Sequence, residues 1–166
     1  GCNNLTSVVM GNGVTSIASN AFSGCSSLEN IIVNENNTIY KSIDGNLYTK
    51  DGTEILQYAV AKTETSFTIP TTVTKIGVYA FSYCNLAEIS LAENVKSISF
   101  YAFSNSEKLT SVTFGKSVKT INKGAFQHCK ALVKISYQGT AEEWEQVKKG
   151  EGWSEGVAAP SVDFNN

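Results

Sequence analysis

The chain has 166 residues, of which 42% are hydrophobic and 17% charged, and its formal net charge at pH 7 is -2. This composition indicates one folded domain with a hydrophobic core and excludes an intrinsically disordered chain. All 13 basic residues are lysines and no apolar run approaches the roughly 18 residues of a membrane span, so we expect neither direct membrane insertion nor nucleic-acid binding, in which arginine makes the commonest specific base contact.

A skeleton of valine, isoleucine, alanine and phenylalanine recurs four times along the chain. It is clearest between Val95 and Phe103, where V-x-x-I is followed by A-F, and each copy leads into a segment with the pattern L-x-x-[IV]-x-[VLFY]. The leading leucines are Leu5, Leu28, Leu86, Leu109 and Leu132. Successive leucines lie 23 residues apart, except across the interval between Leu28 and Leu86. A fixed period of this length predicts a solenoid, in which each coil buries its apolar residues against the neighbouring coils.

Residues 1–33 form the first coils in this interpretation. Residues 5–10 and 31–33 are expected to be the first two strands of a parallel sheet, because their apolar residues alternate. The expected inward residues are Val8, Met10, Ile31 and Val33, and the expected outward residues are Val9 and Ile32.

The first cysteine fits the same register. Cys2 precedes Leu5 by the interval that separates Cys25 from Leu28, so the chain is expected to begin in mid-coil and to be part of a longer array. A lipidated amino-terminal cysteine is the alternative explanation of Cys2.

Residues 34–66 interrupt the repeat. The next strand of the series, Phe67 to Ile69, comes 36 residues after its predecessor rather than 23. Two Asp-Gly pairs, at Asp44 and Asp51, separate short apolar and aromatic runs, which is a strong signal for β-hairpins. We therefore predict a small antiparallel meander that replaces the return side of one coil. A calcium loop is the alternative, but the ligand series of an EF-hand is absent.

Residues 67–138 are regular. Each coil is expected to contain a leucine-led strand, a short V-x-x-I strand on the opposite wall and a tight helical turn at Ala-Phe. The phenylalanines of these turns are predicted to stack as a structural spine, with the first one separated from the others by the hairpins. They are Phe22, Phe81, Phe103 and Phe126.

Residues 139–166 are predicted to cap the last coil. The segment from Thr140 to Glu143 has the spacing of a capping box, so a short helix is expected at about 141–149 with Trp144 and Val147 on one face. Together with Trp153, this helix would cover the apolar end of the array. An exposed tryptophan platform for sugar is the alternative.

The combination of V-x-x-I, A-F, a cysteine and L-x-x-I-x-V resembles the leucine-rich repeats of the BspA-like class, which are found in bacterial surface proteins. The insertion D-G-x-L-Y and the ending Y-x-G-T-x-x-x-W are similar as well. The resemblance implies a right-handed β-rich solenoid, here of five or six coils with one β-hairpin insertion and a C-terminal capping helix. An asparagine after the strand has counterparts only at Asn36 and Asn94, so no asparagine ladder is predicted.

Candidate catalytic or metal-binding residues are few, and we expect neither an enzyme nor a cofactor. His128 occupies a repeat position that holds Gly24, Tyr83 and Asn105 in other copies, which indicates a surface loop residue. The four cysteines share one repeat position, where we interpret them as small buried hydrophobic residues. Cys2 and Cys25 would lie within disulfide reach on adjacent coils, whereas a coil with Ser106 separates Cys84 from Cys129.

Two surface columns are candidates for a binding face. The outward positions of the main sheet are Val9, Ile32, Thr68, Ser90, Thr113 and Ser136. The candidate face consists of the four hydroxyl residues together with a second column formed by Lys96, Lys119 and, one residue later in the repeat, Lys75. Between residues 95 and 134 seven lysines accompany one acidic residue, a polarity that could steer a charged partner.

The resemblance implies a non-catalytic adhesion module that is secreted or lies on a bacterial cell surface. Its expected partner is a surface or matrix protein of a host or a neighbouring cell. The alternative is a structural spacer that projects another domain and has no ligand of its own.

Overall fold

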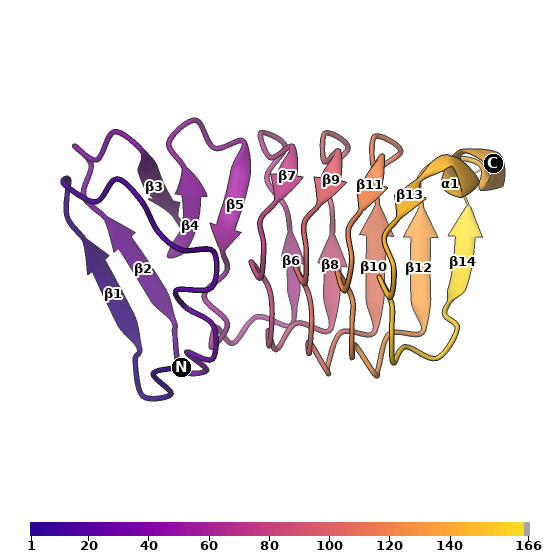
Figure 1. Ribbon diagram of the computed structural model, residues 1–166, viewed down its shortest axis with the longest axis horizontal. Helices are drawn as coiled ribbons and strands as arrows, with labels where there is room; N and C mark the ends of the chain where they lie inside the picture. The colour runs from indigo at the N-terminus through magenta and orange to yellow at the C-terminus, as the bar shows by residue number, and fades with distance from the viewer. Residues whose placement is uncertain (165–166) are drawn as a thin grey trace.

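The computed structural model describes residues 1–164, and these form a β-solenoid of seven turns (Figure 1). One wall contains one strand from each turn, five of them leucine-led, arranged as a two-stranded and a five-stranded parallel sheet. We call it the leucine-led wall. Its strands are β1 Ser7–Met10, β2 Asn30–Val33, β6 Ser66–Thr68, β8 Glu88–Ser90, β10 Ser111–Phe114, β12 Lys134–Tyr137 and β14 Ser161–Phe164. The prediction of a solenoid is confirmed, but the seventh turn exceeds the expected five or six.

The opposite wall is a single seven-stranded sheet. Its strands are β3 Tyr40–Ile43, β4 Asn46–Thr49, β5 Glu54–Gln57, β7 Lys75–Ile76, β9 Ser97–Ile98, β11 Thr120–Ile121 and β13 Lys148–Lys149. The short V-x-x-I strands are parallel and in register, with Ile98 between Ile76 and Ile121. The first copy, from Val14 to Ile17, forms no strand.

Alternation within the leucine-led strands explains the core. Val112 of β10 pairs with Ile89 of β8 and Ile135 of β12, and all three side chains point inward and are buried. The leading leucines Leu86 and Leu109 are buried beside them. Because like residues stack on like residues, each coil completes the apolar surroundings of the next, and burial of each such side chain contributes about 1.5–3 kcal/mol.

The Ala-Phe turns form a third ladder along the axis. The backbone N–H of Phe81 donates to the carbonyl of Ala102 at 2.7 Å, and that of Phe103 donates to the carbonyl of Ala125 at 2.7 Å. The ring of Phe103 lies 5.0 Å from that of Phe81 and 4.8 Å from that of Phe126, centroid to centroid, in stacked geometry. Small alanines at this position allow the turns to approach the core closely.

Two further aromatic residues extend this stack. Tyr58 donates its backbone N–H to Ala80 and stacks on Phe81 at 5.1 Å, so the inserted coil supplies its own aromatic ring. At the other end, Phe126 donates its N–H to Trp153, whose ring packs edge-on at 6.1 Å. The ring of Phe22 belongs to a separate hydrophobic cluster.

The insertion is the predicted antiparallel meander. Strands β3, β4 and β5 pair antiparallel, and the turn between the first two uses Asp44 and Gly45 at φ 48° and 73°, the left-handed conformation that this hairpin turn requires. Strand β5 then runs parallel to β7, which joins the meander to the regular coils.

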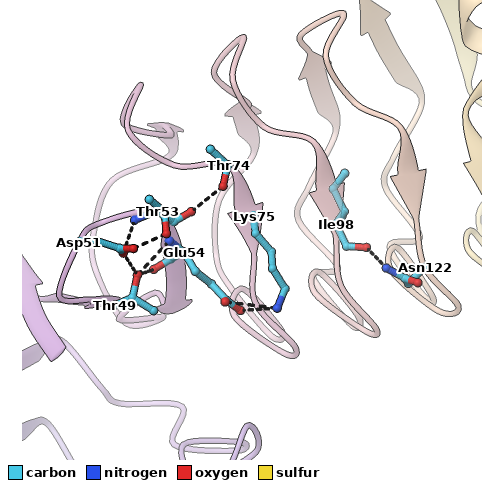
Figure 2. Close-up of polar contacts among 8 residues, drawn as sticks. All are labelled: Thr49, Asp51, Thr53, Glu54, Thr74, Lys75, Ile98 and Asn122. Atoms are coloured by element: carbon cyan, nitrogen blue, oxygen red, sulfur yellow. Dashed lines mark hydrogen bonds and ion pairs between the residues drawn. The ribbon is translucent and has the colours of Figure 1, made fainter. Parts of the chain in front are cut away.

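Polar contacts hold the second turn of the insertion against the first regular coil (Figure 2). The Asp51 carboxylate accepts hydrogen bonds from the Thr49 hydroxyl at 2.7 Å and from the Thr53 backbone N–H at 3.0 Å. These bonds keep the pKa of the Asp51 carboxyl below its usual range. The carbonyl of Thr53 accepts the hydroxyl of Thr74 at 3.3 Å, and Lys75 forms an ion pair with Glu54 at 3.1 Å.

The leucine-led wall is interrupted between β2 and β6, and the hydrophobic core is interrupted with it. The larger cluster runs from Tyr48 to Val147, and a smaller one contains Met10, Leu28 and Ile31. In Figure 1 the strands β1 and β2 are inclined relative to the other strands of their wall. We refer to this interruption as the seam.

A buried asparagine ties the first coils to the insertion. The side-chain amide of Asn37 donates to the carbonyls of Gly11 at 3.0 Å and Val14 at 2.9 Å. Its side-chain oxygen accepts the backbone N–H groups of Ile39 and Tyr40. Asn36, at the position of the post-strand asparagine of other leucine-rich repeats, is exposed.

The C-terminal segment is more than a cap. Thr140 and Glu143 form the predicted capping box of helix α1 Ala141–Gln146, and the ring of Trp144 packs on Phe114 at 5.4 Å. The helix ends three residues before the predicted boundary because Val147 is extended. Strand β13 begins at the next residue, where the backbone N–H of Lys148 donates to the carbonyl of Lys119. Residues 148–164 then complete a seventh coil through Trp153 and β14.

Candidate functional site

The outward surface of the five-stranded sheet is the most regular exposed surface of the molecule. Its members are the side chains that alternate with the inward ones on β6, β8, β10, β12 and β14. We call them the hydroxyl face: Ser66, Thr68, Glu88, Ser90, Ser111, Thr113, Lys134, Ser136, Ser161 and Asp163. Seven of these ten residues are serine or threonine.

The four hydroxyl residues singled out by the sequence lie in one row of this face. Thr68 pairs with Ser90, which pairs with Thr113, which pairs with Ser136. Asp163 of β14 continues the row, and its carboxylate lies 3.1 Å from the Lys134 ammonium group in the neighbouring row. A shallow groove of about 220 Å³ follows the face across β6, β8 and β10.

Short side chains give this face its chemical character. Serine and threonine hydroxyls both donate and accept hydrogen bonds, and they do not extend far from the backbone. Threonine is enriched in strands for its β-branched shape, but serine lacks that branch, so β-propensity alone does not account for Ser90, Ser111 and Ser136. The face is therefore a flat array of hydrogen-bonding groups on a rigid sheet.

The expected column does not extend to the first two strands. Val9 and Ile32 do pair with each other and point outward, with exposed fractions of 77% and 44%. Their two-stranded sheet is separate from the hydroxyl face, because β2 and β6 are not hydrogen-bonded to each other. The seam thus separates an apolar pair from the hydroxyl rows.

The lysine column is divided in the same way. Lys96 and Lys119 occupy the same position on adjacent coils, and the backbone N–H of Lys119 donates to the carbonyl of Lys96 at 2.8 Å. Lys75 pairs in register with Ser97, one position away, and its ammonium group is bound to Glu54 (Figure 2). The structure therefore brings together Lys96 and Lys119 but directs Lys75 elsewhere.

A groove that sequence reasoning missed lies beside these two lysines. It has a volume of about 370 Å³ and is lined by Lys96, Lys116, Ser117, Lys119 and Glu143. Lys116 belongs to the corner that links the two walls, so it shares no repeat column with the other two lysines. Only the three-dimensional path of the chain brings it next to them.

The cysteines and the histidine provide no reactive cluster. Cys25, Cys84 and Cys129 are buried thiols, and burial raises the pKa of both the Cys84 and the Cys129 thiols, the latter to about 12. Cys2 is exposed, so the interpretation of all four as buried residues is wrong for the first one. Within residues 1–164 no three His, Cys, Asp or Glu side chains gather where they could hold a metal ion.

His128 lies in a turn whose backbone geometry recurs along the coils. Its φ is 59°, close to the values of 60° and 58° for Tyr83 and Asn105 at the same repeat position and of 73° for Gly24. The side chain is half-buried and packs near Gly156 of the following coil. Its position reflects the turn rather than a constellation of reactive groups.

The stacked parallel strands, the leucine-led core and the recurring turns define a leucine-rich-repeat solenoid. The family model described as "BspA type Leucine rich repeat region" matches residues 1–49 and 53–147 in six copies, so the chain belongs to this family. The seventh coil, at residues 148–164, lies beyond the matched residues.

Solved structures with similar folds come from several bacteria. Pneumococcal vaccine antigen PcpA is 25% identical, with a TM-score of 0.86 over 98% of this chain and 40% of that chain. A leucine-rich repeat protein from Bacteroides capillosus ATCC 29799 is 24% identical, with a TM-score of 0.63 over 76% of this chain and 99% of that chain. A leucine rich cell surface protein from Faecalibacterium prausnitzii A2-165 is 23% identical, with a TM-score of 0.52 over 87% of this chain and 51% of that chain.

The chain therefore spans less than half the length of its pneumococcal structural neighbour. No curated protein sequence matches it significantly. Among the helices of the described residues, none has the length and apolar character needed to cross a membrane.

Proposed function

We propose that this domain is a non-catalytic protein-binding module that acts in adhesion, either on a bacterial cell surface or as a secreted protein. Its partner is a surface or matrix protein of a host or of a neighbouring cell, and the hydroxyl face is the surface that binds it. The surface location is supported by membership of the BspA-type family and by the likeness to a pneumococcal vaccine antigen.

The hydroxyl face is the observation that carries the proposal. Extended solenoid surfaces serve as binding faces because the coils hold many exposed groups in fixed positions. Here the hydroxyls of Thr68, Ser90, Thr113 and Ser136 follow one another in register across four parallel strands. A partner that lies along this row can hydrogen-bond to several of them, and the short side chains of the row lose little entropy on binding.

The proposal is tested by placing charges on the face. In the triple variant Ser90→Glu, Thr113→Glu and Ser136→Glu, three long carboxylates protrude from the row and carry charge into any interface. The matched control is Thr63→Glu, Thr65→Glu and Thr71→Glu, which adds the same charge at exposed residues outside the strands. Circular dichroism and urea unfolding establish that both variants remain folded.

Binding is measured against a panel of immobilised matrix proteins and intact host cells. We expect the face variant to lose at least tenfold in affinity for the partner that the wild-type chain binds, and the control to remain within about threefold. Unchanged binding of the face variant would exclude this surface. If the wild-type chain binds no member of the panel, the role of a structural spacer becomes the better description.

A further inference from the structure

The groove at the corner of the two walls points to a second ligand of different chemistry. We propose that Lys96, Lys116 and Lys119 form a binding site for an acidic glycan, with sulfate and carboxylate groups on its sugar rings. This site lies apart from the hydroxyl face and is not required for protein binding there, although both would serve attachment to a cell surface.

The first argument is the charge that remains uncompensated in the groove. Four other lysines form ion pairs with acidic side chains, for example Lys130 with Glu107 at 2.8 Å and Lys134 with Asp163 at 3.1 Å. For Lys96, Lys116 and Lys119, no carboxylate of residues 1–164 lies within the 4.0 Å of an ion pair. All three side chains are exposed, so their ammonium groups are available to a ligand.

The second argument is that the backbone holds the lysines in fixed positions. Lys96 and Lys119 lie on neighbouring coils joined by the 2.8 Å bond between their main chains, about one strand spacing apart. The carbonyl of Lys116 accepts the hydroxyl of the buried Tyr137 at 3.2 Å. The preceding Gly115 packs so closely on the neighbouring coil that an added Cβ would lie 2.7 Å from the Cα of Glu93. The corner is therefore built as a tight, rigid turn.

The third argument is the composition of the lining. Besides the lysines the groove contains the Ser117 hydroxyl and the Glu143 carboxylate, one of whose oxygens already accepts the backbone N–H of Thr140 at 3.0 Å. Three ammonium groups and one carboxylate leave a net charge of +2. This charge complements a disaccharide unit that carries one sulfate and one carboxylate.

Glu143 favours a sugar over an acidic peptide. The side chains of an acidic peptide offer only carboxylates, which Glu143 repels. A sugar also offers hydroxyl groups, which can donate to the free oxygen of Glu143 and accept from the lysines. The volume of about 370 Å³ suits one or two sugar rings rather than a long polymer track. Glu93 at the position of Lys116 in the preceding coil limits the positive charge on that side.

The test uses the full chain with chondroitin sulfate octasaccharide as the probe. Hyaluronan octasaccharide supplies carboxylates without sulfate, dextran supplies uncharged sugar, and poly-glutamate supplies an acidic peptide. We expect chondroitin sulfate to bind at least tenfold tighter than hyaluronan and poly-glutamate, and dextran not to bind. Binding should weaken as salt is raised, because screening reduces the attraction between exposed charges.

Two charge-matched variants assign the binding to the groove. The triple variant Lys96→Gln, Lys116→Gln and Lys119→Gln should lose at least tenfold in affinity for chondroitin sulfate. The control Lys50→Gln, Lys108→Gln and Lys130→Gln removes the same charge from exposed sites elsewhere and should stay within about threefold.

Three results would overturn the glycan proposal. These are no binding of chondroitin sulfate, equal loss in both triple variants, or poly-glutamate binding as tightly as the sulfated probe. The last result would indicate an acidic peptide or unspecific charge attraction instead of a sugar site. Since no protein partner enters this experiment, its failure leaves the proposal for the hydroxyl face untouched, and the glutamate variants of that face should bind the glycan normally.

Discussion

Removal of the Phe103 side chain tests the packing on which the solenoid depends. The ring is fully buried and lies between Phe81 and Phe126 at centroid distances of 5.0 and 4.8 Å. Truncation of a buried phenylalanine to alanine costs about 3–5 kcal/mol in lost burial and in the cavity left behind. Stacked aromatic pairs contribute about 0.5–1.5 kcal/mol each beyond burial, and Phe103→Ala removes two of them. We therefore expect a loss near the upper end, about 5 kcal/mol.

The assay is equilibrium urea unfolding followed by far-UV circular dichroism, with tryptophan fluorescence as a second probe. Trp144 and Trp153 lie in the C-terminal part of the chain, so agreement of the two probes indicates that the array unfolds as one unit. Phe103→Leu keeps most of the volume and should lose much less than the alanine variant.

A surface phenylalanine provides the control. Phe100 is 49% exposed, and Phe100→Ala should change the free energy of unfolding by no more than about 0.5 kcal/mol. If Phe103→Ala lost less than about 1 kcal/mol, the stacked rings would not support the core, and the explanation of the repeat by this aromatic stack would be wrong.

Three other substitutions follow from the structure. Tyr58→Phe should raise the free energy of unfolding by about 1–3 kcal/mol in urea titrations, because the tyrosine hydroxyl is buried and has no hydrogen-bond partner among the described residues; a decrease would mean that the hydroxyl is satisfied. Asn37→Ala removes four hydrogen bonds, so it should cost about 2–6 kcal/mol at roughly 0.5–1.5 kcal/mol per bond and speed hydrogen exchange at Ile39 and Tyr40. Asn36→Ala at the neighbouring exposed site should be neutral. Asp51→Asn should reduce the acid sensitivity of the fold. The pKa of Asp51 is lowered from its usual 3.8 in the folded chain. The stabilisation by its carboxylate is therefore complete above pH 3.8 and is lost as the pH falls toward the folded-state pKa. Urea midpoints between pH 6 and pH 2 should therefore decline more steeply for the wild type than for Asp51→Asn, and parallel curves would contradict this explanation.

The regular coils could be predicted from the sequence because their fold depends on local periodicity. Leu109 leads into a strand in which Val112 and Phe114 alternate with polar residues, and the same pattern returns in the adjacent coils. The Asp-Gly pairs identified the hairpins for a similar reason, since Asp44 and Gly45 adopt the positive φ values of a tight turn. In both cases the sequence of a few residues determines the local geometry.

The two ends of the aromatic stack could not be predicted in this way. Tyr58 is followed by alanine rather than preceded by it, and Trp153 has no V-x-x-I segment before it. The last strand was missed because Val162 follows Ile135, its partner in the sheet, by 27 residues instead of 23. These residues take their places through backbone hydrogen bonds to the preceding coil, which a sequence pattern does not reveal.

The seam and the corner groove also depend on tertiary structure. The long interval before Phe67 indicated an insertion, but not that β2 and β6 would remain unpaired. Comparison of repeat columns connected Lys96 with Lys119. It did not find Lys116, which reaches the groove from the corner between the two walls. It also assigned Lys75 to a column, although Glu54 on the neighbouring strand of the same sheet binds it.

The seam has a mechanical consequence, because it determines where the array opens under tension. Hydrogen bonds between coils run along the axis of the array, so tension on the two ends separates neighbouring coils one after another. Between Ser66 and Phe164, neighbouring coils are joined by hydrogen bonds in both walls and between their Ala-Phe turns or the equivalent segment at Trp153. No sheet hydrogen bonds join β2 to β6. A pulling force should therefore open the molecule first at the insertion and lengthen it there, while the block that contains the hydroxyl face and the corner groove stays folded.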